Sequence, residues 1–597
     1  MVRTMAEGGR ELNASAKPWP TAKAEFVLTC RGRQWIPPRT NHRHRGKPIK
    51  LYTSGRFTRM PPSQPLPYDP QFTSPEEYIA SLLTFTSDPL FQILCGGVHI
   101  LDFFTRDSDA EPTDLYHEIL PTDWISFFSA QEVPSILDYL LRIPIDQFPK
   151  TCPQTLVTFI TQVRVHSLNR GFTRPPAPAK TKKSAGISHS GEEGALNTGM
   201  RPKKIHEVEN FSAFVDDLVS NVNARDKPTG GEGITHILDF GSGQAYLSRT
   251  LAKKYGHNVV GIESRPGNIE GAKEMDARFE NLAKKRERKG RKRQQSGEST
   301  SRATNGDSIA AEETAPNTSN NGKSGTLQYI QKCISGNDLT PITTLIPFPT
   351  PKSLLLISLH SCGNLLHHGL TSFLTTPSVK ACALIGCCYN LLTEKSGATY
   401  KPPLRSLHPR LVTTSAVADP DGFPLSHRFT HTRPGVRLNI TARMMACQAP
   451  GNWTASSSEA FFTRHFFRAL LQRIFFDRGL VTGAEPVIIG SLRKKCYSSF
   501  GEYVFGAIDK IGWTQRLQVS VDEVARYEEL FAPRKKDLSV LWSLMAFCAG
   551  VVESLIVVDR WVYLMEGVGK GLLKEAWVEA GFEYGASPRN LVVVGVR

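Results

Sequence analysis

The stretch 234–248 constrains the fold of this chain more than any other. Its apolar run ends in Asp239, passes through Gly241 and Gly243, and continues into a pattern with helical spacing. A strand, a glycine turn and a helix in this order begin the nucleotide-binding α/β folds. Glycine is needed where a ligand must lie against bare backbone, because a Cβ atom would hold the ligand away. The stretch therefore predicts a cofactor site at the first strand of a Rossmann-like sheet.

Two classes of cofactor compete for this turn. A dinucleotide site with the spacing G-x-G-x-x-G needs a small residue at position 246, where this chain has Tyr246. Sites for S-adenosylmethionine (SAM) prefer D-x-G-x-G-x-G, and the small residue Ala245 occupies the third glycine position. The turn therefore favours SAM over a dinucleotide.

Two acidic residues further along the chain extend the predicted cofactor site. Glu263 follows the apolar run 258–262 and lies 24 positions after Asp239, close to where this fold places the acid that binds ribose hydroxyls. Asp338 follows a further predicted strand, 326–334, where such folds contact the adenine ring. We therefore expect the methionine part of SAM to be bound by Asp239, Gly241 and Gly243, the ribose by Glu263, and the adenine by Asp338.

The composition divides the chain into four parts. Residues 1–70 are rich in Pro, Arg, Gly and Ser, which predicts a disordered or loose arm. Residues 71–173 show helical spacing, and 174–202 form a linker rich in Pro, Lys and Ser. Residues 203–597 contain the SAM-binding pattern and form the main domain. A charged and Ser-rich insertion at 284–321 interrupts this domain and cannot bury enough apolar surface to fold.

The helical region has a recognisable start. Ser74 is placed as an N-cap, Pro75 as the first helical residue and Glu77 as the partner in a capping box. Helical spacing predicts further helices over 90–104, 122–129, 133–141 and 153–165.

An amphipathic helix precedes the glycine turn. It opens with Lys203-Lys-Ile-His-Glu207 and continues through Val219, with apolar residues along one face. Its place directly before the turn would let its first residues cap the cofactor pocket. We expect His206 to face that pocket.

The charge of the chain favours an anionic partner. The net charge is +16, of which the basic run 284–293 contributes +7 and the remaining residues +9. An excess of positive charge is typical of proteins that bind nucleic acids, so we expect RNA as the partner. The basic run also resembles a nuclear localisation signal.

Cysteine usage and hydropathy indicate an intracellular protein. The eleven cysteines form no regular disulfide framework, and no apolar signal-peptide segment follows the first charges. The longest apolar window, 541–558, contains Glu553, which is costly inside a bilayer. We therefore expect a buried helix there, no membrane association, and a location in the cytoplasm, the nucleus or both.

Polar residues follow two apolar strands and are candidates for catalysis. The run 353–359 ends at His360, and the run 381–386 ends at Cys387. Carboxyl ends of strands in open α/β sheets line the ligand crevice. Histidine can act there as a base toward a hydroxyl or a nitrogen, since its pKa lies near neutrality. We expect the transferred methyl group to be faced by His360, Cys387 and Tyr389.

A metal site is an alternative use of the cysteines. Cys362, Cys387, Cys388 and Cys447 could bind zinc together with His360. The adjacent pair Cys387-Cys388, however, lacks the two to four intervening residues that are usual for zinc ligands. We therefore predict no metal, and interpret at least two of the four cysteines as small buried residues at strand ends.

A set of ordered motifs resembles the methyltransferase-like protein 25 family, which includes a relative named for a ribosomal RNA adenine dimethylase domain. The match runs from about residue 72 to the C-terminus and excludes the insertions. The motifs are Lys203-Lys-x-His-Glu207, Asp239-Phe-Gly-Ser-Gly-Gln-Ala-Tyr-Leu-Ser248, Leu359-His-Ser-Cys-Gly-Asn-Leu365, Gly386-Cys-Cys-Tyr-Asn-Leu-Leu392, Asp421-Gly-Phe-Pro-Leu-Ser426, Ala446-Cys-Gln448 and Ser587-Pro-Arg-Asn590.

The resemblance implies an α/β fold with a class I SAM-methyltransferase Rossmann-like sheet. Together with the composition, it predicts such a sheet with an N-terminal helical region and disordered insertions. The family leaves the methyl acceptor undefined. At 360–363 the chain has His-Ser-Cys-Gly in place of the Asn/Asp-Pro-Pro-aromatic tetrad typical of adenine amine methylation. This strand end is also similar to that of the transfer-RNA 2′-O-methyltransferase of the Cys-Cys-His type, which favours RNA modification at a hydroxyl.

The chain departs from the family at two places. The family has Lys-Gly where this chain has Gln244-Ala245, and His where it has Asn390. These departures keep open a non-catalytic module that binds RNA or protein on the SAM fold. A protein methyltransferase is the other alternative.

Overall fold

The computed structural model describes residues 61–104, 115–172, 196–226, 230, 233–297, 325–336, 338–346, 353–396, 418–432, 436–482 and 487–597. These residues fall into two compact units, one containing 487–521 and the other containing the described parts of 61–486 and 522–597. The smaller unit holds a 3₁₀ helix, Lys494–Tyr497, and α17 (Phe500–Lys510). The sheet and the candidate site belong to the larger unit.

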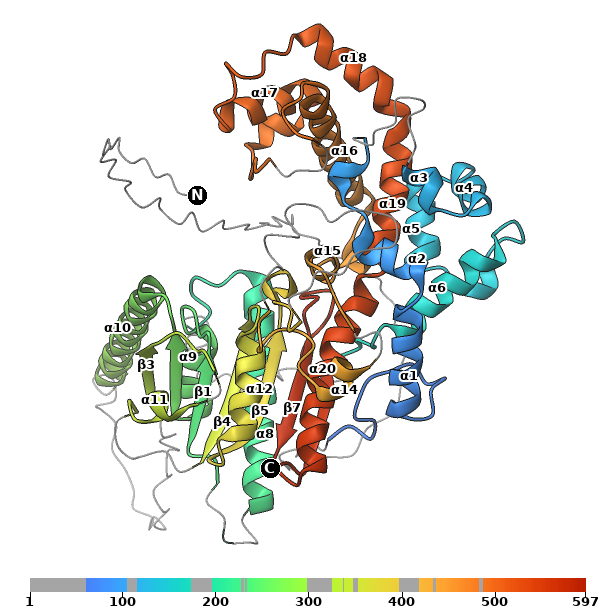
Figure 1. The fold of residues 1–597 in the computed structure, drawn as a ribbon. Coiled ribbons are helices and arrows are strands. Elements are labelled where there is room, and N and C mark those ends of the chain that lie inside the picture. Colours follow the sequence, from blue (N-terminus) through green and yellow to red (C-terminus); the bar gives the residue numbers. More distant parts are fainter. Residues whose placement is uncertain are drawn as a thin grey trace, which may run out of the picture. The chain divides into compact units, whose positions relative to one another are not determined.

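A seven-stranded sheet has the order β3-β2-β1-β4-β5-β7-β6 (Figure 1). The first five strands are parallel, whereas β7 runs antiparallel to both β5 and β6. This is the topology of the class I SAM methyltransferases, and it confirms the predicted fold class. The strands are β1 (His236–Phe240), β2 (Val259–Glu263), β3 (Leu327–Gln331), β4 (Leu354–Ser361), β5 (Val379–Gly386), β6 (Glu575–Ala580) and β7 (Leu591–Val596).

Helices cover the sheet and connect its strands. Among the described residues, three short α-helices follow the N-terminal helical region: α11 (Thr340–Thr343), α14 (His427–His431) and α15 (Ile440–Met445). The longer ones are α8 (Pro202–Asp226), α9 (Tyr246–Tyr255), α10 (Pro266–Gly297), α12 (Leu365–Thr375), α16 (Ala455–Asp477), α18 (Val521–Phe531), α19 (Lys535–Phe547) and α20 (Ala549–Gly569).

The N-terminal helical region contains α1 (Pro75–Thr86), α2 (Pro89–Gln92), α3 (Leu115–Ile119), α4 (Thr122–Ser129), α5 (Val133–Leu141) and α6 (Gln154–His166). The N-cap of α1 is as predicted, since the Ser74 hydroxyl accepts the Glu77 N–H. The predicted capping box is wrong, because the Glu77 carboxylate accepts the Thr73 N–H in place of the Ser74 N–H. The predicted helix over 90–104 is helical over most of its length, but it is not one continuous α-helix. It is broken into α2, a π-helical turn (Ile93–Gly97) and a 3₁₀ turn (Ile100–Asp102), because Gly96-Gly97 is a poor helix former.

This helical region is not separate from the rest of the larger unit. The Leu168 N–H donates to the Ser554 hydroxyl on α20, and Arg170 forms an ion pair with Glu553 of the same helix at 2.7 Å. The end of the predicted loose arm is also packed: Leu66 is buried, and the Pro65 carbonyl accepts the N–H of a residue on β6. Residues 1–60 lie outside the described residues.

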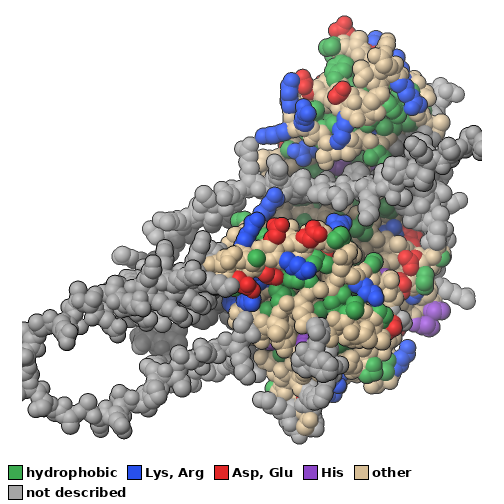
Figure 2. All heavy atoms as spheres, turned by 90° about the vertical axis from the view of Figure 1, so that its left-hand side faces the viewer, with side chains coloured by type: hydrophobic (Ala, Val, Ile, Leu, Met, Phe, Trp, Pro, Cys, Tyr) green, Lys and Arg blue, Asp and Glu red, His purple; other side chains and the backbone are tan. Residues whose placement is uncertain are grey.

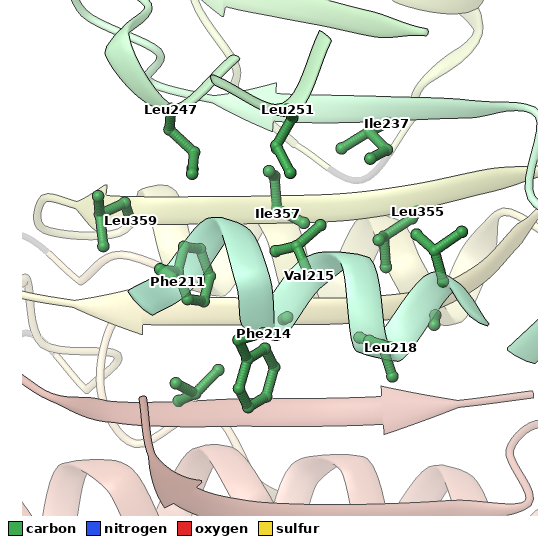
Figure 3. Packing of buried hydrophobic residues seen from close by; sticks show 14 of the residues in the cluster. Phe211, Phe214, Val215, Leu218, Ile237, Leu247, Leu251, Leu355, Ile357 and Leu359 are labelled. Atoms are coloured by element: carbon green, nitrogen blue, oxygen red, sulfur yellow. The ribbon is translucent and has the colours of Figure 1, made fainter. Parts of the chain in front are cut away.

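The apolar face of α8 anchors that helix to the sheet. Figure 3 shows Val215 of this helix directed at Ile357 of β4, and Phe214 directed at the neighbouring C-terminal strand of the sheet. Burying each such side chain stabilises the fold by roughly 1.5–3 kcal/mol. The packing fixes α8 so that its first turn reaches the carboxyl edge of β4, as the contacts below show. The residues in this part of the core are Phe211, Phe214, Val215, Leu218, Ile237, Leu247, Leu251, Leu355, Ile357 and Leu359.

The predicted unfolded insertion at 284–321 begins too early. α10 continues through Gly297, so the basic run 284–293 is part of a helix. Lys, Arg, Glu and Gln are good helix formers, which favours continuation of the helix through this run. Residues 298–324 lie outside the described residues.

One helical stretch among the described residues, Val521–Gly569, is notable for its hydropathy. It contains a window long and apolar enough to cross a membrane by length and composition, with a mean hydropathy of 2.1, and 94% of that window is buried inside the protein. Burial of α19 and α20 agrees with the buried helix predicted around 541–558. Glu553, near the middle of α20, is neutralised there by Arg170 and Arg589.

Candidate cofactor and active site

The parallel strands bring most of the predicted site residues to one edge of the sheet. Asp239 lies at the end of β1 and Glu263 ends β2. His360 is the last but one residue of β4, and Cys387 directly follows β5. Because parallel strands end at the same edge, residues up to 148 positions apart in the sequence lie at one edge of the sheet.

The glycine turn has a backbone that suits close approach of a ligand. Gly241 and Gly243 have φ values of +69° and +57°, a region that other residues adopt only at a cost. A Cβ added at Gly243 would meet no described atom within 4 Å, so open space lies beside this residue. Ala245 also has a positive φ, +56°, which costs about 1–2 kcal/mol for a residue with a Cβ.

Glu263 ties the glycine turn to the end of β2. Its carboxylate accepts the Gly243 N–H at 3.0 Å and the Arg265 N–H at 2.9 Å. A carboxylate offers about four lone-pair positions, so it can accept further hydrogen bonds from ribose hydroxyls. The open space at Gly243 and the acid beside it therefore fit the predicted SAM site.

Asp239 is buried beneath the turn. It is 2% exposed and accepts a hydrogen bond of 2.6 Å from the Ser248 hydroxyl in the first turn of α9. Burial raises the pKa of Asp239 to about 7, although the Ser248 hydrogen bond and the Lys204 ammonium act in the opposite direction. This carboxyl group therefore changes its protonation near neutral pH.

Asp338 stands apart from this cluster in its contacts. Its side chain is exposed and accepts the Thr340 N–H at 2.8 Å, which closes the turn before α11. A role in binding adenine stays a prediction, and the neighbouring position 337 lies outside the described residues.

His360 is held by a carboxylate that comes from α8. Its Nε2 lies 3.0 Å from Glu207 Oε2, and the other Glu207 oxygen accepts a hydrogen bond of 2.7 Å from the Ser587 hydroxyl, in the loop between β6 and β7. Lys204 Nζ lies 3.5 Å from the same carboxylate. Burial opposes ionisation of Glu207, but His360, Lys204 and Ser587 outweigh it and lower the pKa of Glu207 to about 2.

The strand that carries His360 is irregular at this point. The pairing of β4 with β5 shifts register between Ser358 and Ser361. Such irregularities turn side chains out of the regular alternation and are frequent beside active sites. The His360 side chain is 38% exposed, so its ring is accessible to solvent, whereas the Glu207 side chain is buried.

The sequence analysis missed Glu207, Lys204 and Ser587. It singled out His206 instead, whose Nε2 accepts the Glu583 N–H at 3.2 Å and so supports the loop after β6. These three residues belong to two motifs that the sequence does show, at 203–207 and 587–590. Nothing in the sequence, however, says that these two motifs meet.

Three cysteines gather where β4 and β5 end. The sulfur of Cys362 lies 3.5 Å from that of Cys387 and 3.3 Å from that of Cys388, and the last two are 3.5 Å apart. Hydrogen bonds from the thiols of Cys387 and Cys388 lower the pKa of Cys362 to about 4. Cys447 is directed elsewhere, with its sulfur 3.5 Å from Asn390 Oδ1.

The Tyr389 side chain is directed into the protein. Its hydroxyl donates to Glu553 on α20 at 2.8 Å, and the ring is buried between the Arg560 and Arg589 guanidinium groups. Of the three residues expected to face the methyl group, the structure thus brings His360 and Cys387 to the carboxyl edge of the sheet and directs the Tyr389 hydroxyl into the protein.

Known proteins with similar sequences include methyltransferase-like proteins. Residues 203–395 match the model of a methyltransferase domain. The probable methyltransferase-like protein 25 of Mus musculus is 26% identical over 623 aligned residues, covering 89% of this chain and 98% of the relative. The protein of the same description from Homo sapiens is 23% identical over 607 residues, covering 85% and 95%.

One solved structure was also found, the plantazolicin methyltransferase BpumL in complex with SAH. It is 12% identical, covers 55% of this chain and 91% of its own, and has a TM-score of 0.16, too low to support an argument. The narrower subtype named for ribosomal RNA adenine dimethylation stays a prediction. The chain carries a methyltransferase domain of the class I fold, which uses SAM, and is similar over most of its length to methyltransferase-like protein 25.

Proposed function

We propose that this protein methylates RNA, with His360 as the base that removes a proton from the acceptor. The observation that carries the proposal is the pair formed by His360 and Glu207 at the carboxyl edge of β4. Asp239, Glu263 and the glycine turn lie at the ends of neighbouring strands of the same sheet.

The chain supplies alignment and proton removal. When bound, SAM supplies a methyl group that is already activated, so the protein mainly orients the acceptor. The Glu207 carboxylate accepts a hydrogen bond from Nε2–H, which fixes the ring and leaves Nδ1 as the acceptor for the substrate's proton. Among the described residues, none hydrogen-bonds to Nδ1. The same carboxylate stabilises the imidazolium that forms.

Cys387 is the second side chain that we propose for the acceptor side. It follows β5 directly and contacts the Ser361 carbonyl through its own backbone N–H at 3.4 Å, so it is fixed beside the end of β4. Its role would be to shape the crevice next to His360. Proton removal itself is assigned to the histidine.

Charge supports RNA as the acceptor. The net charge is +16, and +9 remains without the basic run 284–293, which the structure places on α10. Figure 2 shows Lys and Arg mixed with Asp and Glu on the described part of the face that it displays. On that face the positive charge is spread out, which suits weak contacts to a phosphate backbone at several points.

The decisive experiment is transfer of a radioactive methyl group. The full chain is incubated with tritiated SAM and either total RNA or a protein extract. We expect label in RNA that ribonuclease releases, and its loss in His360→Ala. His431→Ala is the matched control, because this exposed histidine lies on α14 and its contacts with the described residues are a hydrogen bond within that helix and a ring contact with His427.

Two results would contradict the proposal. Label in protein alone would identify a protein methyltransferase. SAM binding without label in either fraction would identify a module that binds RNA or protein and does not turn over, which the positive φ of Ala245 and the Asn at 390 favour.

A further inference from the structure

The three cysteines at the ends of β4 and β5 form a compact triangle on a rigid frame. Ser361 pairs with Gly386 in the sheet, so the residues that follow these two strands are side by side. The Gly363 N–H reaches the Cys388 carbonyl at 3.4 Å. A Cβ at Gly363 would lie 2.7 Å from the Leu391 carbonyl oxygen, which shows how closely the two segments cross.

The dimensions of the triangle match a zinc site. Its sides are 3.3, 3.5 and 3.5 Å. Zinc takes thiolate ligands at about 2.3 Å in tetrahedral geometry, which sets sulfur atoms about 3.8 Å apart. Shifts of a few tenths of an ångström would therefore seat the metal. The three sulfurs are the one group in the described chain whose cysteine, histidine and acidic side chains converge in this way.

We propose that Cys362, Cys387 and Cys388 bind a zinc ion as three thiolates, with the fourth coordination position open to an exchangeable ligand. Soft thiolates select zinc among the common divalent ions. Three protein ligands with one open position is the pattern of zinc sites that bind a water or a substrate. In zinc sites with C-x₂₋₄-C spacing, both cysteines come from one turn of the chain. In this site Cys387 and Cys388 follow β5, and Cys362 follows the neighbouring strand β4.

Two nearby residues, Cys447 and His360, could supply a fourth zinc ligand, but both make other contacts. Cys447 is engaged by Asn390 and by the backbone carbonyls of residues 387 and 443. His360 uses its Nε2 on Glu207. The site is therefore placed beside the proposed base, but it does not depend on the identity of the methyl acceptor or on turnover.

Metal analysis of the full chain tests the proposal. The protein is expressed in zinc-supplemented medium, separated from loose metal by gel filtration, and measured by inductively coupled plasma mass spectrometry. We expect about one zinc per chain, falling at least fivefold in Cys362→Ser and in Cys388→Ser. Cys333→Ser is the control, because this cysteine is exposed and outside the triangle, and it keeps the zinc.

A second measurement uses the wild type alone, so it tests the proposal even if the serine variants fail to fold. Zinc K-edge absorption is expected to show three sulfur neighbours at about 2.3 Å and one nitrogen or oxygen. Gly243→Arg should keep its zinc even if it loses SAM, which separates this proposal from the one on function.

Several results would overturn the proposal. They are a wild type without zinc, iron in its place, zinc retained by both serine variants, or a disulfide between Cys362 and Cys388 in freshly prepared protein. A fourth sulfur neighbour that disappears in Cys447→Ser would show that the site is closed.

Discussion

The two halves of the carboxyl edge are built in different ways. In the β1–β2 half, Gly243 and Glu263 are joined by a hydrogen bond across only 20 positions of sequence. In the β4–β5 half, His360 depends on Glu207, 153 positions away, and Glu207 on Ser587, 380 positions away. The first half uses backbone conformation to receive a cofactor, and the second uses side chains that only the folded chain assembles.

The largest effect is expected in the second half. His360→Ala should lower kcat by about 10²- to 10⁴-fold, because the acceptor's proton has no other base, and Glu207→Gln should lower it by a smaller factor. The Kd for SAM should stay within about twofold, since neither residue belongs to the glycine turn. Steady-state kinetics and isothermal titration measure the two quantities. An equal loss of SAM affinity and kcat would remove the distinction between the halves.

A substitution in the first half should do the opposite. Gly243→Arg fills the open space beside the turn and should weaken SAM binding by at least about 100-fold, or 2.7 kcal/mol. Gly571→Arg is matched to it. Its φ is +71°, a Cβ there also meets nothing within 4 Å, and it lies before β6, which starts at the opposite edge of the sheet. The two variants should lose similar stability. Titration with SAM would contradict this if Gly571→Arg bound equally poorly.

The buried acid of the first half predicts a pH effect on stability. The pKa of Asp239 is raised to about 7, from an ordinary value of 3.8. The folded protein therefore keeps a proton that the unfolded chain releases, so this group's contribution to stability is full below pH 4 and falls as the pH rises toward 7.

Asp239→Asn should lose that pH dependence. The free energy of unfolding of the variant, relative to wild type, should rise by about 2 kcal/mol between pH 5 and pH 7. Urea unfolding without SAM at several pH values measures this difference. A difference that stays constant with pH would show that Asp239 is ionised throughout.

The smallest effect on turnover is expected for Tyr389→Phe, which tests whether Tyr389 belongs to the β4–β5 half of the site. Tyr389→Phe removes the hydroxyl that donates to Glu553 and should cost about 1–3 kcal/mol of stability. Turnover should stay within about twofold, because the hydroxyl is directed into the core. Thermal unfolding and methyl-transfer assays test both statements. A tenfold lower kcat at unchanged stability would return Tyr389 to the acceptor side.

Much of the fold could be read from local patterns. The predicted helices over 122–129 and 133–141 coincide with α4 and α5, and the helical spacing predicted after the glycine turn corresponds to α9. The strand β6 was missed, because Glu575-Ala-Trp-Val-Glu-Ala580 contains four residues of low strand preference and lies at the edge of the sheet. The apolar window 541–558 was predicted as one buried helix, whereas it is divided at Cys548 between α19 and α20.

The sequence alone determined the α/β class and the cofactor turn, since hydrophobic period and glycine conformation are properties of neighbouring residues. It also pointed to His360 and Cys387 by their position after apolar strands. Only the tertiary structure decided what surrounds them. Packing of α8 on β4 brought Glu207 to His360, the β6–β7 loop brought Ser587 to Glu207, and the pairing of β4 with β5 brought three cysteines together. Contacts over such distances depend on strand order and helix packing, which no single stretch of sequence contains.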